Sequence, residues 1–477
     1  MNIKLTVSVT FSLIVLSAIV ASTMSSSQGA PPESQASTPD SPPAFAWAVA
    51  GGGKANDKIR GCCFDAAGNA FLAGEASDTV AFAGGELPAA AAMNFFLTKV
   101  DPAGKPLWSR TGGGSLIDRG YGVATDQAGN CYVTGSYQST DAEFDGIKLP
   151  QRGNYDLFVA KYDPAGKLVW IETAGGAGYD YGHGIAVDSR GDVIVTGAVV
   201  GLAKFGKASG GEIEVGDGTI AHPFCAKYHA DGKLAWVKAG EAQAGGAGYG
   251  VAVDARDRIY VGGLTSGTGR FGNKPLVTPK GSSALVIVLT PAGDVEWIAQ
   301  QFGEGSCLFH EIACDAEGRV WACGMFKGRA TFGSEVFMTT GPKDNDAFVS
   351  HFTPAGKHAW TRVGQSPGTD YGLGIATDGR GNSYLTGEFA NDFKLGGATL
   401  MSRGGVDVYV AKFDASGTLH WITQAGGATG DNAYTLAHHP QHGILIGGSF
   451  SGTAKFGDSE LTSGGATDFY GAKLKAD

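Results

Sequence analysis

Short apolar runs separated by turn-forming residues recur along most of the chain and predict β-strands. The segment DYGHGIAVDSRGDVIVTG, residues 180–197, contains two such runs joined by a tight turn. Segments equivalent to its GIAVD begin at Gly61, Gly122, Gly184, Gly250, Glu311, Gly374 and Thr435. Each is followed by a second apolar run and, about 20 residues later, by a third and a fourth, as in FVAKYDPAGKLVW from Phe158. The pattern predicts seven repeats of four strands each.

The connections between the predicted strands have the composition of hairpin turns. In the DPAGK turn, Asp163–Lys167, the proline suits the first turn position and the glycine suits a left-handed residue. We therefore interpret the aspartate as a turn cap and not as a metal ligand. The same interpretation covers DQAGN at Asp126 and DSRGD at Asp188, and it places the tripeptide Arg190–Asp192 (RGD) in a turn, with adhesion-receptor binding as the alternative.

A tryptophan marks each predicted fourth strand, at intervals of 61 to 66 residues: Trp47, Trp108, Trp170, Trp236, Trp297, Trp360 and Trp421. If each hairpin closes at the Asp and Lys of DPAGK, Trp170 faces Ala160, with Phe158 and Tyr162 as diagonal neighbours. The partners expected for other tryptophans are Thr98, Ala226, Ile287, Ser350 and Ala411. We predict that the tryptophans pack in the core.

Repeated four-stranded antiparallel units of this length are typical of a β-propeller. The fourth strand around Trp47 comes before the first repeat, whereas the last repeat has no fourth strand after its third. We therefore predict an all-β, seven-bladed β-propeller over residues 44–477, in which the N-terminal strand AFAWAVAG completes the last blade. In that arrangement Trp47 lies opposite Ala472, beside Tyr470 and Leu474.

The first residues have the features of an export signal. Lys4 precedes the apolar run Leu5–Ser22, and small residues before Thr23 offer a cleavage point. We predict a signal peptide over residues 1–22, with a retained membrane anchor as the alternative. Residues 23–43 are rich in Ser, Pro, Gln and Ala and predict a disordered tether. We expect an exported protein that is periplasmic, at the cell surface or extracellular and contacts a membrane only through such an anchor.

The motif GIAVDSRGDVIVTG, together with FVAKYDPAGKLVW, resembles the SBBP repeat family over residues 44–477. That family consists of predicted seven-bladed propellers in exported bacterial and archaeal proteins and surface-layer-like glycoproteins. NHL-type propellers share the GIAVD-like phrase but usually have shorter repeats, so they are the second resemblance. The SBBP resemblance implies an exported or surface location and no particular activity, since a fold does not dictate chemistry.

The net charge of −10 and the lack of a basic stripe argue against a nucleic-acid partner. The chain has seven cysteines at differing repeat positions: Cys62, Cys63, Cys131, Cys225, Cys307, Cys314 and Cys323. We interpret them as replacements for small apolar residues, with a Cys314–Cys323 disulfide as the alternative.

No nucleophile elbow, zinc-protease motif, phosphate loop or EF-hand loop occurs in the sequence. His438, His439 and His442 cluster in a predicted exposed turn that has no Cys or carboxylate nearby in the sequence. We therefore predict no catalytic residue, no metal site and no cofactor, with a transition-metal site at these histidines as the alternative.

One position, immediately before the GIAVD-like segments, collects polar and aromatic residues. It holds Arg60, Tyr121, His183, Tyr249, His310, Leu373 and Tyr434. Five repeats also carry an aspartate at the entry to the innermost strand: Asp57, Asp118, Asp180, Asp370 and Asp431. The long connections, from fourth to first and from second to third strands, are expected to gather on one binding face.

We predict that these residues, Leu373 excepted, surround the channel mouth on that face and bind a small ligand. With Arg60 as the only strong cation among several aspartates, the mouth favours a neutral or cationic polar ligand such as a sugar. The alternative is that the aspartates cap backbone amides and the tyrosines pack between blades.

We expect a non-catalytic scaffold that binds a protein or glycan partner through this face. The alternative is an enzyme of the lyase or hydrolase type in the channel mouth. A convergent histidine and carboxylate in a closed pocket favour the enzyme, whereas a wide mouth with capping aspartates favours the scaffold.

Overall fold

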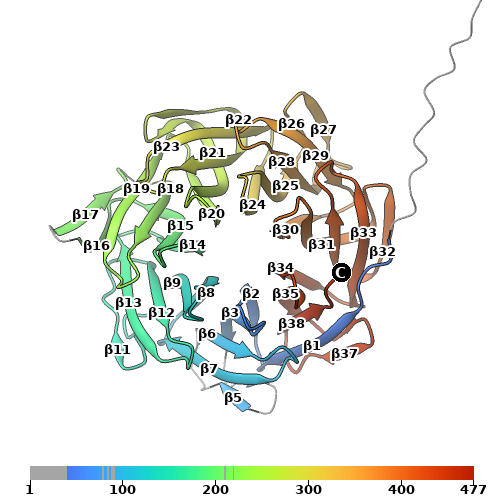
Figure 1. Cartoon of the computed structure of the whole chain (residues 1–477), viewed down its shortest axis with the longest axis horizontal. Coiled ribbons are helices and arrows are strands. Elements are labelled where there is room, and N and C mark those ends of the chain that lie inside the picture. The colour runs from blue at the N-terminus through green and yellow to red at the C-terminus, as the bar shows by residue number, and fades with distance from the viewer. Residues whose placement is uncertain (1–39, 78–79, 83–84, 88–91, 209–210, 219) are drawn as a thin grey trace, which may run out of the picture. The chain divides into compact units, whose positions relative to one another are not determined.

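The computed structural model describes residues 40–77, 80–82, 85–87, 92–208, 211–218 and 220–477. The expected signal peptide, residues 1–22, and the tether up to residue 39 lie outside the described residues. The described part of the chain contains strands but no helix, and thus none long and apolar enough to cross a membrane. The strands surround a central opening (Figure 1), which confirms the predicted all-β propeller.

The propeller is built from four-stranded antiparallel ladders that run outward from the opening (Figure 1). The innermost strands are β2 (Lys58–Phe64), β8 (Asp118–Thr125), β14 (Tyr181–Val187), β20 (Gly246–Val253), β24 (Cys307–Cys314), β30 (Tyr371–Thr377) and β34 (Asp431–His439). The second strands are β3 (Ala70–Ser77), β9 (Cys131–Tyr137), β15 (Val193–Val200), β21 (Ile259–Phe271), β25 (Val320–Lys327), β31 (Ser383–Leu395) and β35 (Gly443–Phe450). The third strands are β6 (Met93–Val100), β12 (Asp156–Tyr162), β18 (Ala221–Tyr228), β22 (Lys274–Leu289), β28 (Asn345–Phe352), β32 (Ala398–Phe413) and β38 (Asp468–Leu474). The outer strands are β7 (Pro106–Gly113), β13 (Leu168–Gly175), β19 (Leu234–Ala242), β23 (Val295–Gly303), β29 (His358–Gly364), β33 (Leu419–Gly427) and β1 (Phe45–Gly52).

Segments between the second and third strands cross over to the outer strand of the preceding ladder. The short strands involved are β4 (Val80–Phe82) with β5 (Gly85–Leu87), β10 (Glu143–Phe144) with β11 (Ile147–Lys148), β16 (Ala203–Ala208) with β17 (Gly211–Val215), β26 (Arg329–Phe332) with β27 (Glu335–Met338), and β36 (Thr453–Phe456) with β37 (Ser459–Thr462). β4 pairs with β1, β10 with β7, β16 with β13, β26 with β23 and β36 with β33. The prediction that these connections gather as loops on a binding face is therefore wrong for these segments, because they form hairpins that pair with the last two residues of the preceding outer strand.

Large apolar side chains fill the space between neighbouring ladders. Phe95 of β6 lies 5.4 Å, between ring centroids, from Phe158 of the next ladder and also from Phe144 of β10, the crossover strand that pairs with β7. All three rings are fully buried. Since the alternating side chains of each ladder face a neighbour on both sides, the core consists of the layers between ladders and not of the central channel.

β1 pairs antiparallel with β38, although the two strands lie at opposite ends of the sequence. The predicted register is wrong by one residue: Trp47 pairs with Lys473 and not Ala472, and Trp170 pairs with Lys161 and not Ala160. The same shift gives the other tryptophans the partners Lys99, Lys227, Val288, His351 and Lys412. A β-bulge near each hairpin causes the shift, because it adds one residue to the outer strand.

The tryptophans tie each ladder to the next one. The indole Nε1 of Trp47, Trp108, Trp170, Trp236 and Trp360 donates a hydrogen bond of 2.9–3.2 Å to a backbone carbonyl in the neighbouring third-to-fourth strand turn. The turn glycine lies beneath the ring, since a Cβ on Gly166 would come within 2.7 Å of Trp108. The tryptophans therefore pack between ladders, as predicted, and also donate hydrogen bonds across the gap.

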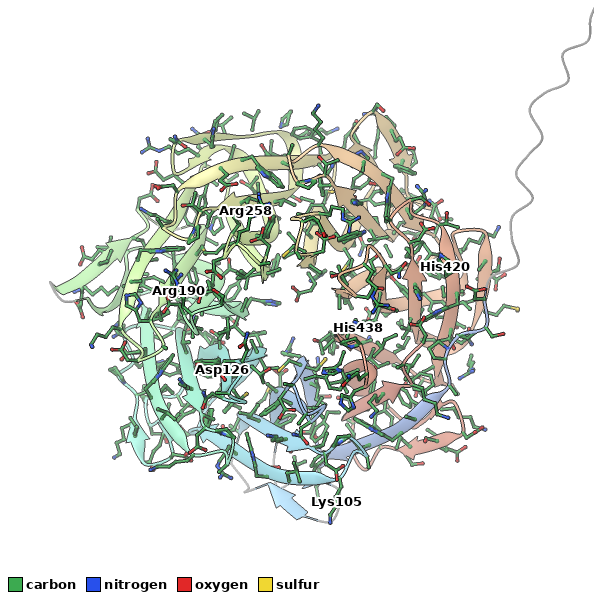
Figure 2. All side chains as sticks on the ribbon, in the orientation of Figure 1. Lys105, Asp126, Arg190, Arg258, His420 and His438 are labelled. Atoms are coloured by element: carbon green, nitrogen blue, oxygen red, sulfur yellow. The ribbon has the colours of Figure 1, made fainter. Side chains whose placement is uncertain are left out.

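The hairpin turns follow the predicted chemistry. The Asp126 carboxylate accepts the N–H groups of Ala128 and Asn130 at 2.9 Å, and Gly129 has a φ of +80°. In the RGD turn the Asp192 side chain is buried, and its carboxylate lies 3.3 Å from Lys227 Nζ. Asp126 and Arg190 are labelled in Figure 2. An acid held in this way is not available to an adhesion receptor.

All seven cysteines are free thiols. In the ladder Cys314 pairs with Val320, and Cys323 pairs with Glu311. The alternative Cys314–Cys323 disulfide is therefore not formed.

Candidate functional site

A β-bulge interrupts every innermost strand at an equivalent place. In each pairing with the second strand one residue is skipped, as between Gly182 and Gly184 of β14. The skipped residues are Arg60, Tyr121, His183, Tyr249, His310, Leu373 and Tyr434. Because a bulge redirects a side chain that would otherwise face a neighbouring strand, it accounts for the inward direction of this position.

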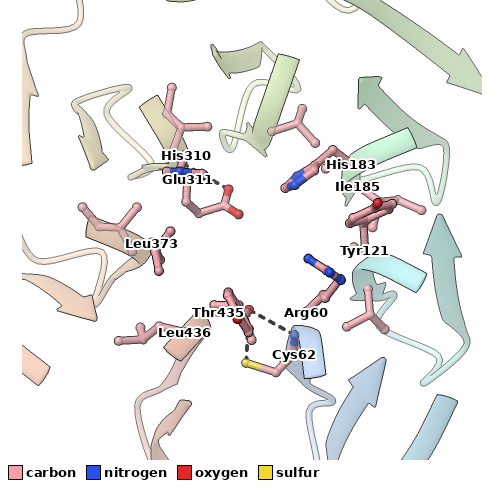
Figure 3. Close-up of a pocket in the computed structure, with 18 of the residues that line it drawn as sticks. Arg60, Cys62, Tyr121, His183, Ile185, His310, Glu311, Leu373, Thr435 and Leu436 are labelled. Atoms are coloured by element: carbon pink, nitrogen blue, oxygen red, sulfur yellow. Dashed lines mark hydrogen bonds between the residues drawn. The ribbon is translucent and has the colours of Figure 1, made fainter. Parts of the chain in front are cut away.

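The bulged residues line a central cavity of about 520 Å³ (Figure 3). Those in its wall are Arg60, Tyr121, His183, His310, Leu373 and Tyr434. Tyr249 lines a second pocket of about 310 Å³ together with Tyr181 and Leu264. The structure thus brings six of the seven equivalent residues into one cavity and places the seventh, Tyr249, against its histidines.

Neighbouring side chains of this ring touch one another. The rings of Tyr121 and His183 stack with centroids 5.1 Å apart, and His183 meets Tyr249 edge-on at the same distance. Arg60 lies between aromatic faces, 5.2 Å from the centroid of Tyr121 and 5.7 Å from that of Tyr434. These contacts hold the polar groups in place and occupy part of the aromatic surface.

The glycine that follows most of the bulges allows the innermost strands to approach closely. A Cβ on Gly122 would lie 2.6 Å from the carbonyl oxygen of His183. Two repeats replace this glycine, with Glu311 and Thr435. Thr435 Oγ1 accepts the Cys62 N–H at 3.1 Å and so links β34 to β2.

Glu311 adds a carboxylate to the cavity that the sequence analysis did not identify. Its carboxyl points toward the middle of the cavity (Figure 3), and its Oε1 accepts the Ile312 N–H at 3.1 Å. Oε1 lies only 2.2 Å from where a Cβ on Gly250 would be, so that glycine is required for its position. Burial raises the pKa of Glu311 to about 7. The sequence could have indicated this residue, because it places a charged side chain where five other repeats have glycine.

The two histidines of the ring are neutral near pH 7. Burial lowers the pKa of His183 to about 3 and that of His310 to about 4. His183 Nδ1 lies 3.0 Å from the carbonyl oxygen of Tyr249 and donates a hydrogen bond to it. Its Nε2 is therefore the unprotonated nitrogen, an acceptor at the cavity (Figure 3).

The charges of the channel differ from those predicted. Arg60 donates two hydrogen bonds to the Glu75 carboxylate, at 2.5 and 2.7 Å, and Arg119 Nε lies 3.6 Å from the same group. Lys58 has its Nζ 5.7 Å from the Tyr434 ring centroid, and its pKa is lowered by burial and by Arg60. Arg60 is therefore not the only strong cation of this region, and its acidic neighbour is a glutamate.

The five predicted aspartates do not line the cavity. Asp57, Asp118, Asp180, Asp370 and Asp431 are fully buried and accept hydrogen bonds from loop backbone N–H groups. Asp180, for example, accepts the N–H groups of Gly176 and Val200, both at 2.7 Å. Burial raises the pKa of Asp370 and Asp431 to about 7. Their assignment to a ligand site is corrected: they cap the loops that enter the innermost strands.

The histidine cluster at the end of β34 and in the following turn shows one close pair. The rings of His439 and His442 have centroids 4.5 Å apart, whereas the His438 ring stacks on Tyr384 at 4.6 Å. Within the part of the chain that the structure describes, no group of three or more His, Cys, Asp or Glu side chains is arranged to hold a metal ion.

Comparisons with known proteins give distant similarities. No protein-family model matches the chain. An uncharacterised WD repeat-containing protein of Acanthamoeba polyphaga mimivirus is 22% identical over 408 residues, covering 68% of this chain and 28% of that protein. The chain therefore aligns with little more than a quarter of the length of this relative.

Among solved structures, a protein of unknown function from Bacteroides caccae has 10% identity and a TM-score of 0.29, covering 59% of this chain and 94% of that one. A glucose dehydrogenase has 12% identity and a TM-score of 0.32, covering 69% of this chain and 95% of the other. A puromycin hydrolase has 10% identity and a TM-score of 0.34, with coverages of 87% and 62%. At these TM-scores the similarities say nothing about the cavity.

Proposed function

We propose that the protein is an exported, non-catalytic β-propeller of the SBBP type with seven blades, which binds a small polar ligand in its central channel. A protein or glycan partner at the cell surface is the expected source of that ligand. The apolar run Leu5–Ser22 after Lys4 supports export. The distant similarity to a WD repeat-containing protein supports a binding scaffold.

The strand pairing supports seven blades. The four-stranded ladder recurs for each GIAVD-like segment. Crossover hairpins extend several ladders to six strands, and the pairing of β19 with β21 joins two ladders into one larger sheet. β1 supplies the outer strand of the ladder that contains β34, β35 and β38. We propose that this pairing closes the ring, with the first strand of the body completing the last blade.

One observation carries the binding function: equivalent bulges aim side chains from successive strands into one cavity of about 520 Å³. This volume is typical of sites for small molecules. The wall offers a neutral histidine acceptor at His183, a carboxyl at Glu311 and a guanidinium at Arg60. Such groups recognise a polar ligand through hydrogen bonds.

A glycan and metabolite screen by thermal shift and calorimetry on the mature protein tests this function. We expect the double variant His183→Ala, Tyr249→Ala to abolish binding of the ligand that the screen finds, because it removes the Nε2 acceptor and the ring supporting it. The melting midpoint should stay nearly unchanged, since both side chains are only partly buried.

The matched control is His358→Ala, a partly buried histidine of the outer strand β29 that bonds to Thr361. It should leave the affinity intact. Unchanged affinity in the double variant, or an equal loss in the control, contradicts a ligand site in the channel.

A lyase or hydrolase is the second candidate, because His183 and Glu311 share the cavity. A carboxyl with a pKa of about 7 can exchange protons with a substrate near neutral pH. The capping role of the aspartates and the low pKa of His183 favour the scaffold instead. Turnover of the bound ligand that is lost in Glu311→Gln would establish the enzyme.

A further inference from the structure

One side of the central cavity carries an excess of positive charge. Arg60 lines the cavity there, whereas Lys58 and Arg119 lie near Arg60 around the Glu75 carboxylate, which contacts both guanidiniums. Glu388 is the second acid on this side, where it accepts a hydrogen bond from the Asn432 amide. This group therefore has three positive and two negative charges when both acids are ionised.

The other side carries a carboxyl without a countercharge. Glu311 projects into the cavity opposite Arg60 (Figure 3). Its hydrogen-bond partner among the described residues is the N–H of Ile312, and none of their cations pairs with it. Its neighbours His183 and His310 are neutral. Leaving a buried carboxylate unpaired is costly, so this position favours a cation supplied from outside.

We propose that the channel ligand is a small zwitterion, whose ammonium group pairs with Glu311 and whose anionic group binds on the Arg60 side. This inference rests on the proposed function, since it names the ligand class of the same cavity. The two charged ends match the dipolar cavity. The atoms between them pass the Tyr121 ring and the Leu373 side chain, which line the wall.

The proposal predicts that ligand binding changes the number of protons bound to the protein. The Glu311 carboxyl is partly protonated near neutral pH, because burial raises its pKa to about 7. A ligand ammonium beside it favours the ionised form and lowers this pKa. Ionisation of Glu311 should therefore release protons on binding near pH 6.5 and raise the affinity as the pH increases from about 5 to about 8. Glu388 lines the same cavity with a pKa raised to about 7 by burial and takes up protons when an anion binds near it, so the contribution of Glu311 is the release that Glu311→Gln removes.

The test uses calorimetry on the mature protein with ω-amino acids of increasing length, from glycine to 6-aminohexanoate. Butylamine and butyrate serve as probes with one charged end. We expect one ω-amino acid to bind at least about tenfold more tightly than either one-ended probe. Measurements in two buffers of different ionisation enthalpy should show proton release.

Glu311→Gln keeps the size of the side chain and removes its charge. It should weaken binding of the best ω-amino acid by about tenfold or more, abolish the proton release and leave butyrate binding unchanged. The matched control is Glu317→Gln in the turn of the same ladder, where the side chain is 63% exposed. It should change none of these quantities.

The proposal is overturned if no ω-amino acid binds better than butylamine and butyrate, or if Glu311→Gln leaves both affinity and proton release intact. A sugar or other neutral molecule that binds and loses affinity in the His183→Ala, Tyr249→Ala variant would retain the binding function and reject the zwitterion. Failure of every compound in the screen would reject both.

Discussion

The three glutamates around the channel differ in their hydrogen-bond and ion-pair partners. Glu75 pairs with Arg60, and Glu388 accepts a hydrogen bond from Asn432. Glu311 has only the N–H of Ile312, so burial dominates and raises its pKa to about 7. Burial likewise raises the pKa of Glu388 to about 7. Both carboxyls therefore change protonation near neutral pH, and Glu311 is the one of the two without a side-chain hydrogen-bond partner among the described residues.

This pKa has a consequence for stability. The folded-state pKa of Glu311 lies above the value of about 4.3 in an unfolded chain, so the folded state holds the proton more tightly. Its contribution is fully present below about pH 4 and is lost as the pH rises to about 7. In the parent protein the free energy of unfolding should therefore fall between about pH 5 and pH 8. We expect this fall to be smaller in Glu311→Gln, by an amount on the order of 1 kcal/mol.

Urea unfolding of both proteins at each pH measures this difference. Glu317→Gln, at an exposed turn, should follow the parent profile. Parallel profiles for the parent and Glu311→Gln would show that this carboxyl has an ordinary pKa.

Single residues of the site could be predicted only in part. Repeat alignment identified Arg60 and His183 as equivalent, but a bulge leaves no mark in composition, so the reason for their inward direction could not be predicted. The aspartates were misassigned although a signal was present. Gly176 lies four residues before Asp180, and this spacing lets a carboxylate accept the N–H of the loop. Glu311 was missed because the same alignment treated the position as glycine.

At the scale of elements, each contact between ladders pairs an outer-strand indole with a turn of the next ladder. Two indoles differ in their hydrogen bonds. Trp297 Nε1 is buried without a partner among the described residues, and Trp421 Nε1 donates to the Asp477 carboxylate at 3.0 Å. The same carboxylate accepts the Tyr384 hydroxyl at 3.0 Å and lies 2.8 Å from Lys412 Nζ. The residues after β38 thus take the place that a hairpin turn has elsewhere.

Asp477→Ala should lower the stability of this contact. Three donors lose their acceptor, one of them charged, and each such loss typically costs about 1 to 3 kcal/mol. We expect a lower midpoint in thermal and urea unfolding. Asp458→Ala, at an exposed turn between β36 and β37, should leave the midpoint unchanged. Equal midpoints for the two variants would mean that the carboxylate contributes nothing to the contact.

The hairpins could be predicted better than their register. Asp126 and Gly129 occupy the expected turn positions, because side-chain capping and positive φ restrict the choice of residue. The partner of Trp170 was wrong by one residue, since one extra residue in the outer strand suits many side chains equally well. That one-residue shift decides which face of the strand the indole occupies.

For the whole molecule, the pairing of β1 with β38, through which we propose that the ring closes, is the feature with the largest expected effect. Deletion of residues 44–51 removes most of β1 and the buried part of Trp47, and it exposes the edge of β38. Loss of a large aromatic side chain alone typically costs about 3 to 5 kcal/mol of stability. The open edge of β38 can also pair with strands of other molecules, which promotes aggregation. We expect a strongly lowered midpoint and aggregation, measured by denaturation and light scattering.

Trp47→Phe is the matched control, because it keeps the strand and most of the apolar contact. It should lose little more than the indole hydrogen bond to Pro102. A deletion variant as stable as this control would rule out closure through β1.

The pairing of β1 with β38 also has a mechanical consequence. Phe45 pairs with Leu474 and Gly51 with Phe469, so the start of β1 and the end of β38 lie at the same end of the pair. A force that pulls the chain before Phe45 away from the chain after Leu474 acts at one end of the strand pair. It therefore breaks the hydrogen bonds one after another, beginning at Phe45, and the strands separate from that end instead of sliding past each other. Bonds broken in sequence yield at a much smaller force than bonds loaded together. If β1 closes the ring, this one pair of strands is where a modest pulling force opens it.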